Sequence, residues 1–249
     1  MTALATACRR ILPRGWGDLV RQLLIWFGFL FAYQLARGVA DRNPARAFEN
    51  GLQVISLEQR SHALVELSLQ RIVDSSHFVA TIAGWTYWNS EFTVVGLALL
   101  WVYLRRHGAF HRFRNTILFA NVLGLVGYVL LPTAPPRMFP DFGFVDTLSS
   151  VGGLNSGSGL VQLAANPYAA MPSLHAADSL IVGVVLASLC RRKLTKALWL
   201  LWPLWVWFSV LGTANHFWLD VVAGIALAAI AIWIVYRPQL RRPEPATAA

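Results

Sequence analysis

The sequence segment 215–220, which reads NHFWLD, places a histidine and an aspartate four residues apart. On a continuous helix, side chains with this spacing lie on one face, about one turn apart. Asp220 can then accept a hydrogen bond from one ring nitrogen of His216, which fixes the tautomer and raises the basicity of the other nitrogen. This is the orienting half of a catalytic triad, although the same pair could equally be a structural contact between two helices.

A serine and a histidine stand close together in segment 171–175, which reads MPSLH. The proline disfavours helix before it, and Ser173 is well suited as an N-cap, so we predict that a helix begins here. The N–H groups at a helix start bind anions readily, and His175 would lie beside the bound anion. The simpler alternative is an ordinary capped helix that carries an interfacial histidine.

A lone arginine, Arg137, closes the proline-rich segment 132–137, which reads PTAPPR. The prolines end any preceding helix and stiffen the chain around the arginine. The planar guanidinium suits a bidentate contact with phosphate, although arginines that only anchor a lipid head group are also common.

The elements that must position these residues are membrane helices. Of the 249 residues, 56% are hydrophobic and only 13% are charged, whereas a soluble domain carries roughly a quarter charged residues. The formal charge of +9 comes from short basic flanks between apolar runs, which excludes an ordinary soluble enzyme and argues against nucleic-acid binding. Cys8 and Cys190 give no disulfide framework.

We predict an all-α membrane protein in which residues 19–236 form one six-helix bundle, between an N-terminal arm (1–18) and a tail (237–249). A helix needs about 20 mostly apolar residues to cross the hydrocarbon core. Residues 41–76 are predicted to form an additional interfacial or extramembrane helical segment. The first span could alternatively be a cleaved signal peptide. The six predicted spans are 19–37, 85–104, 115–132, 174–190, 197–214 and 217–236.

Basic residues set the orientation of these spans. Lysine and arginine gather before span one, between spans two and three, between spans four and five, and after span six, so we place these ends and both termini in the cytoplasm. The connection 133–173 has Arg137 as its one basic residue and is predicted to be an outer active-site loop. Its Gly- and Ser-rich part, 149–160, would be a mobile flap near the site or simply a flexible connection.

The three motifs therefore converge on the outer ends of spans three, four and six. An arginine with helix N–H groups can bind a phosphate, an oriented histidine can attack phosphorus, and a second histidine can protonate the departing oxygen. We expect a phosphoryl-transfer site that requires neither a metal nor a cofactor.

This combination resembles the type 2 phosphatidic acid phosphatase superfamily of membrane lipid phosphatases and phosphotransferases. The similarity covers about residues 85–236 and three ordered motifs. The first motif ends in an arginine, matched by Arg137, and the second is Pro-Ser-x-His, at 172–175. The third is a serine, here Ser209, followed seven residues later by His-x-x-x-Asp, at 216–220.

The resemblance implies a phosphohistidine intermediate on His216, oriented by Asp220, with His175 as general acid toward the leaving group. It also implies that Arg137 and Ser173 hold the phosphate. The substrate would be a phospholipid, a sphingolipid or a polyprenyl phosphate.

Three positions depart from the phosphatase pattern, which has Lys, Pro and Arg where this chain has Leu130, Met138 and Val210. Two phosphate-clamping cations are therefore missing. The segments 134–137 (APPR) and 220–224 (DVVAG) look more like the inositol phosphorylceramide synthase branch. In that branch a phospho-head group passes to a lipid hydroxyl.

Three further polar residues are candidates for contacting the head group or supporting the motif residues: Glu91, Asp178 and Asn215. Asp178 could orient His175, pair with Arg137 or make a structural hydrogen bond. Glu91 could bind a polyol head group or pack against another helix.

Two other classes of protein remain open. In a transporter, the intramembrane histidine and aspartate could relay protons, but the halves of the chain show no repeat. In a haem or metal protein, His175 and His216 would have to converge on one ion, and Arg137 would have no purpose beside it. Within the enzyme hypothesis, the attacking group can be water or a lipid hydroxyl, giving either a phosphatase or a transferase.

Overall fold

The computed structural model describes residues 12–40, 43–151 and 167–240. Within these ranges the chain is helical, as predicted, and its extended pairing is limited to an isolated bridge between Thr133 and Ala169. Residues 1–11 of the predicted arm, residues 152–160 of the predicted flap and residues 241–249 of the tail lie outside the described residues.

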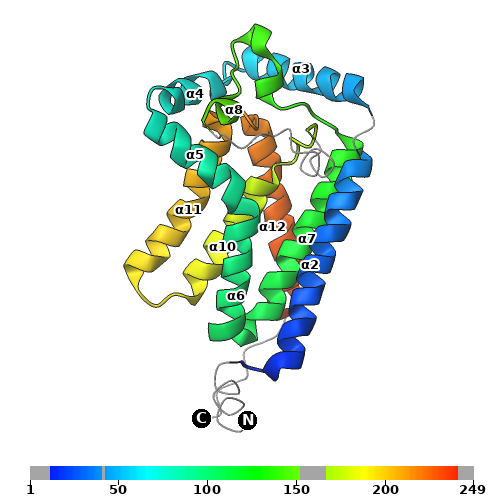
Figure 1. Cartoon of the computed structure of the whole chain (residues 1–249), viewed down its shortest axis with the longest axis vertical. Coiled ribbons are helices and arrows are strands. Elements are labelled where there is room, and N and C mark those ends of the chain that lie inside the picture. Colours follow the sequence, from blue (N-terminus) through cyan, green and yellow to red (C-terminus); the bar gives the residue numbers. More distant parts are fainter. Residues whose placement is uncertain (1–11, 41–42, 152–166, 241–249) are drawn as a thin grey trace.

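Four helices contain stretches long and apolar enough to cross a membrane. They correspond to the first, third, fifth and sixth predicted spans, and they run along the long axis of the molecule (Figure 1). The helices are α2 (Gly15–Ala40), α7 (His107–Leu130), α11 (Lys193–Gly212) and α12 (Trp218–Leu240).

The other two predicted spans correspond to shorter elements. Span four is α10 (Leu174–Leu189), an apolar helix of 16 residues. Span two falls in a helical run that a π-helical turn divides, giving α5 (His77–Asn89), η1 (Ser90–Val94) and α6 (Val95–Arg105). The count of six spans therefore stays a prediction.

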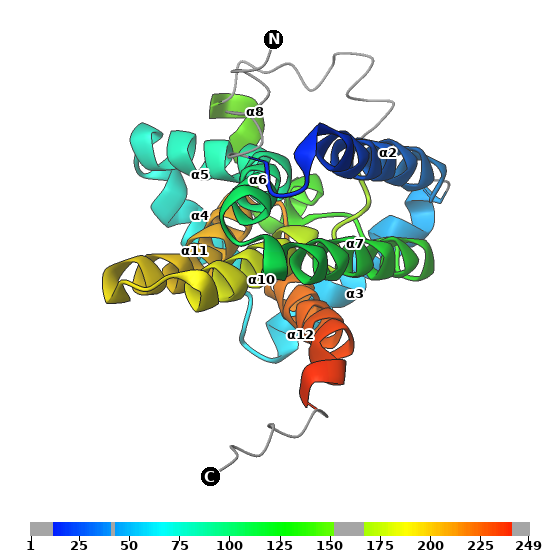
Figure 2. The same cartoon turned by 90° about the horizontal axis from the view of Figure 1, so that it is seen from below.

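Helix α10 lies at the centre of the bundle and packs against α6, α7, α11 and α12 (Figure 2). Helix α2 packs on α7 at the periphery. Close approach between helices depends on glycine: a Cβ at Gly183 of α10 would lie 2.6 Å from the Trp199 carbonyl oxygen of α11. The centre of the bundle is thus too tightly packed to admit even one extra methyl group at this position.

Two amphipathic helices, α3 (Pro44–Arg60) and α4 (Glu66–Asp74), form the predicted extra helical segment. Asn43 caps α3 by accepting a hydrogen bond from the Arg46 N–H group (3.0 Å), and Pro44 takes the first helical position. Both helices lie at one end of the bundle, together with η2 (Pro136–Met138), η3 (Pro140–Phe142) and α8 (Thr147–Val151) (Figure 1). We call this the α3–α4 end.

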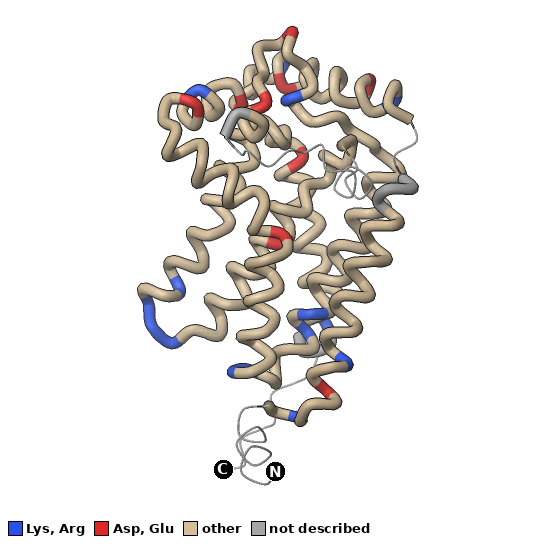
Figure 3. Tube along the Cα trace, in the orientation of Figure 1, with Lys and Arg blue, Asp and Glu red and all other residues tan. Residues whose placement is uncertain are grey.

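Charge is distributed unevenly between the two ends. The basic connections between α6 and α7 and between α10 and α11 lie at the end opposite α3 and α4 (Figure 3). Acidic residues are concentrated in the half nearer α3 and α4 (Figure 3).

Candidate active site

His216 lies in the turn between α11 and α12, where the residue is 4% exposed. Its Nδ1 atom is 2.9 Å from the Ala170 carbonyl oxygen and 3.5 Å from Asp220 Oδ2. A carbonyl can only accept, so Nδ1 carries the proton, and in the neutral imidazole Nε2 carries the lone pair. Of these two groups, the Ala170 carbonyl oxygen is the closer to Nδ1.

Asp220 joins three parts of the site. Helix α12 begins at Trp218, so His216 and Asp220 do not share the continuous helix assumed from their spacing. The Asp220 carboxylate accepts from the Phe217 N–H group (2.8 Å), a capping contact that starts the helix after His216. The Asp220 carbonyl accepts from the Ser173 N–H group (2.9 Å), which fastens α12 to the start of α10.

His175 occupies the first turn of α10, and Ser173 is the N-cap of that helix, as predicted. The Ser173 hydroxyl oxygen accepts from the Ala176 N–H group at 3.3 Å. His175 Nε2 lies 3.1 Å from the Tyr87 carbonyl oxygen, and its ring stacks on the Tyr87 ring with centroids 4.5 Å apart. The rings of His175 and His216 have centroids 5.5 Å apart.

Glu91 lies in the π-helical turn η1 and is 6% exposed. Its Oε2 atom is 3.4 Å from His175 Nε2. Single π-turns within α-helices are common at functional sites because the wider turn redirects a side chain. Here the turn places a carboxylate behind the second histidine.

Arg137 comes from η2, the short turn that follows the prolines after α7. Its backbone N–H group donates to the Ala214 carbonyl oxygen (2.9 Å), and its Nη1 atom donates to Asn215 Oδ1. The Asn215 amide nitrogen donates in turn to the Thr213 carbonyl (3.0 Å) and hydroxyl (2.9 Å) oxygens. Arg137 is thus bound by both backbone and side chain to the turn that carries His216.

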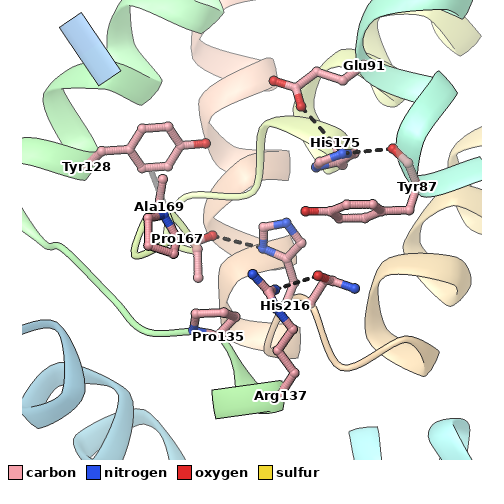
Figure 4. Close-up of a pocket in the computed structure, with 11 residues that line it drawn as sticks. Tyr87, Glu91, Tyr128, Pro135, Arg137, Pro167, Ala169, His175 and His216 are labelled. Carbon is pink, nitrogen blue, oxygen red and sulfur yellow. Dashed lines mark hydrogen bonds and ion pairs between the residues drawn. The ribbon is translucent and has the colours of Figure 1, made fainter. Parts of the chain in front are cut away.

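These side chains line one pocket (Figure 4). Five of the predicted site residues contribute to its wall, and of the other six only Pro135 lies within one of the sequence motifs. The pocket is lined by Glu91, Arg137, His175, Asn215 and His216, with Tyr87, Tyr128, Pro135, Pro167, Ala169 and Ala170.

The remaining predicted site residues are buried behind the pocket wall. Ser173 and Asp220 are fully buried in the contact between α10 and α12. Asp178 contacts Asn121, whose amide nitrogen is 3.1 Å from both carboxylate oxygens. Of the alternatives considered for Asp178, the structural hydrogen bond is the one observed.

The pocket combines a fixed guanidinium with two imidazoles, a set of groups that can bind an anion and transfer protons at its edge. Among the described residues, no group of three or more His, Cys, Asp or Glu side chains is placed to hold a metal ion.

Comparison with known proteins identifies the family. The family model of the PAP2 superfamily matches residues 52–234. The chain belongs to the PAP2 superfamily. It is also 30% identical over 138 residues to a phosphoinositol dihydroceramide synthase from Bacteroides thetaiotaomicron, and the match covers 50% of this chain. The chain spans only 45% of the length of that relative. No solved structure matches this chain. The resemblance to the superfamily and to its inositol phosphorylceramide synthase-like branch is thereby confirmed.

Proposed function

We propose that this protein is a membrane enzyme that transfers a phosphate-bearing group from one lipid to another acceptor through a phosphohistidine intermediate on His216. The observation that carries the proposal is the pocket itself. It brings His216, with its Nδ1 proton fixed, to within 5.5 Å of a second histidine and beside a bound arginine. Membership of the PAP2 superfamily supports a lipid phosphoester as the substrate.

In the first step, Arg137 binds the phosphate and His216 Nε2 attacks phosphorus. The bond from phosphorus to the leaving oxygen breaks, its electron pair goes to that oxygen, and His175 supplies the proton. Because Nε2 of His175 faces the Tyr87 carbonyl and Glu91, the transferred proton comes from Nδ1. The Glu91 carboxylate stabilises the imidazolium form from which His175 donates.

In the second step, an acceptor hydroxyl attacks the phosphorus bound to His216. The phosphorus–nitrogen bond breaks, its electron pair returns to Nε2, and neutral His175 takes the proton of the attacking hydroxyl. Water as the acceptor gives hydrolysis, and a lipid hydroxyl gives transfer. The name of the relative supports a phosphoinositol group as the head group and a ceramide lipid as the acceptor.

The charge distribution supports an extracytoplasmic active site in a bundle of six spans. The pocket is lined in part by Arg137 of η2, an element of the α3–α4 end. The basic connections lie at the opposite end (Figure 3). Lysine and arginine are enriched in cytoplasmic loops, so this asymmetry supports a pocket on the outer side. In this arrangement α10 and the helical run from α5 to α6 complete the bundle.

The test uses purified protein in lipid nanodiscs, a phosphoinositol lipid as donor, a ceramide as acceptor and a panel of lipid phosphates. Lipid products are analysed by mass spectrometry, and inorganic phosphate is measured with and without a chelator. His216→Ala should abolish turnover, while His77→Ala, an exposed histidine at the start of α5, should retain it.

A new head-group-bearing lipid that appears only with acceptor supports transfer. Chelator-resistant phosphate release from lipid phosphates or polyprenyl phosphates would instead assign a phosphatase to the same site. Turnover by the His216→Ala variant would contradict the phosphohistidine mechanism.

A further inference from the structure

Two glutamates from the α3–α4 end are completely buried against the start of α12. Glu66 Oε1 accepts a hydrogen bond from the Trp218 N–H group (2.6 Å), and Glu58 Oε1 accepts from the Leu219 N–H group (3.3 Å). The first N–H groups of a helix have no partner within the helix itself. Side chains from two other helices therefore provide the partners at this helix start.

With Asp220, these glutamates form a set of three carboxyl groups on three consecutive N–H groups, those of residues 217–219. The residue immediately before this set is His216. Carboxyl groups from α3, α4 and α12 itself thus hold the backbone that directly follows His216.

The close approach of acidic groups determines their protonation. Burial, followed by the charge of Glu66, raises the pKa of Glu58 to about 9, with a smaller contribution from Asp220. Burial also raises the pKa of Glu66, and the charge of Asp220 adds to this effect. Near neutral pH Glu58 is therefore a neutral acid whose oxygen accepts from Leu219, a role that a glutamine amide can reproduce.

Helix α3 also holds the segment that carries Arg137. The Ala134 N–H group donates to the Ala47 carbonyl oxygen (3.0 Å), and the Asn50 amide donates to the Pro132 carbonyl oxygen (2.8 Å). Gly51 faces the Phe139 ring so closely that a Cβ would lie 2.5 Å from it. One rigid helix thus contacts both segments that supply the phosphate-binding and attacking groups.

We infer that α3 and α4 position His216 relative to Arg137, and that Glu58 and Glu66 are positioning residues for phosphoryl transfer. This inference rests on the proposed function. Loss of either carboxyl leaves a first-turn N–H group of α12 without its partner, so the turn carrying His216 becomes less well fixed. The phosphate can still bind Arg137, but the attack geometry deteriorates, which lowers kcat and leaves KM nearly unchanged.

The experiment compares Glu58→Ala and Glu66→Ala with Glu58→Gln and Glu66→Gln, and uses Glu49→Ala as the matched control. Glu49 lies on α3 and is exposed. Hydrogen exchange of peptides covering residues 215–222 reports on the start of α12 independently of catalysis. Turnover of the lipid donor gives kcat and KM, and thermal unfolding shows whether each variant is folded.

The alanine variants should exchange the first-turn amides roughly 2- to 30-fold faster, the range for loss of a helix N-cap. They should lose about 10-fold or more in kcat because attack geometry is sensitive to small displacements. Glu58→Gln should recover most of both properties, and Glu49→Ala should match the wild type.

Wild-type exchange rates in both alanine variants would overturn the inference, as would fast exchange combined with wild-type kcat. Equal loss in Glu58→Ala and folded Glu58→Gln would overturn the role of the neutral acid. If the wild-type protein has no turnover on any donor, the proposed function and the catalytic part of the inference both fail. The exchange rates would still decide whether the carboxyls hold α12.

Discussion

Gly224 lies on α12, one turn after Asp220, where this helix crosses the start of α10. A Cβ at this position would overlap the Ser173 carbonyl oxygen and lie 3.1 Å from the Ala176 Cβ atom. Non-bonded carbon atoms attract best at about 3.5–4.0 Å, so Gly224→Ala must push α10 and α12 apart by roughly 0.5–1 Å.

This displacement separates the two histidines, because His175 is on α10 and His216 lies two residues before the start of α12. Their ring centroids are 5.5 Å apart, and the leaving oxygen and phosphorus must fit between them. A misplacement of about 1 Å can cost about 100-fold in rate, so we expect Gly224→Ala to lower kcat by about 10- to 100-fold. Overpacking typically costs about 1–3 kcal/mol of stability, and the contact with a backbone oxygen places this variant at the upper end of that range.

The assay is single-turnover formation of the phosphorylated enzyme from a labelled donor, with thermal unfolding measured in parallel. Gly28→Ala is the matched control, since a Cβ on this glycine of α2 meets no atom within 4 Å. A folded Gly224→Ala protein with the wild-type rate of phosphoenzyme formation would refute the argument that this helix contact sets the distance between the histidines.

Three further substitutions give distinct outcomes. Asp220→Asn should lower kcat by about 10- to 100-fold in steady-state assays. The loss is smaller than the roughly 10,000-fold effect of removing an aspartate that alone fixes the histidine tautomer, because the Ala170 carbonyl also accepts from His216 Nδ1. Glu91→Gln should slow turnover of lipid substrates by about 10- to 100-fold. Turnover of p-nitrophenyl phosphate should be nearly unchanged, because its leaving group needs no proton. Equal losses on both substrates would contradict the role of Glu91 behind His175. The pKa of Glu58 is raised from its usual value of 4.5 to about 9, so this residue makes the folded protein less stable as the pH rises between these two values. Glu58→Gln removes the titrating group, so the unfolding temperature of this variant should fall less than that of the wild type between pH 5 and pH 9. Parallel pH curves for the wild type and this variant would refute the last prediction.

The sequence predicted the pocket better than it predicted the contacts within it. His175, His216 and Arg137 are recognisable because polar groups in an apolar run are costly and demand partners. The carbonyl of Ala170 carries no such signal, since any residue type supplies a backbone oxygen. The main partner of His216 Nδ1 could therefore be found only from the structure.

Residue type also failed to reveal Glu58 and Glu66. On amphipathic helices at a membrane surface, glutamate ordinarily faces water, so the pattern of α3 and α4 predicted an interfacial or extramembrane segment and assigned no role to these two residues. Both glutamates are instead fully buried, because the N–H groups at the start of α12 compensate part of the cost of burying them. The compensating groups lie about 150 residues away in the sequence, beyond the reach of any local pattern.

The capping of α12 also bears on the proposed role of Arg137 in binding the phosphate. A helix start is normally an anion site, but the first N–H groups of α12 are already bound to carboxyl groups. With their N–H groups bound in this way, residues 217–219 offer no backbone donors to an incoming phosphate. Of the described residues that line the pocket, Arg137 is the only lysine or arginine. Its double attachment, through Ala214 and Asn215, therefore fixes a permanent positive charge on which the proposed phosphate could be oriented.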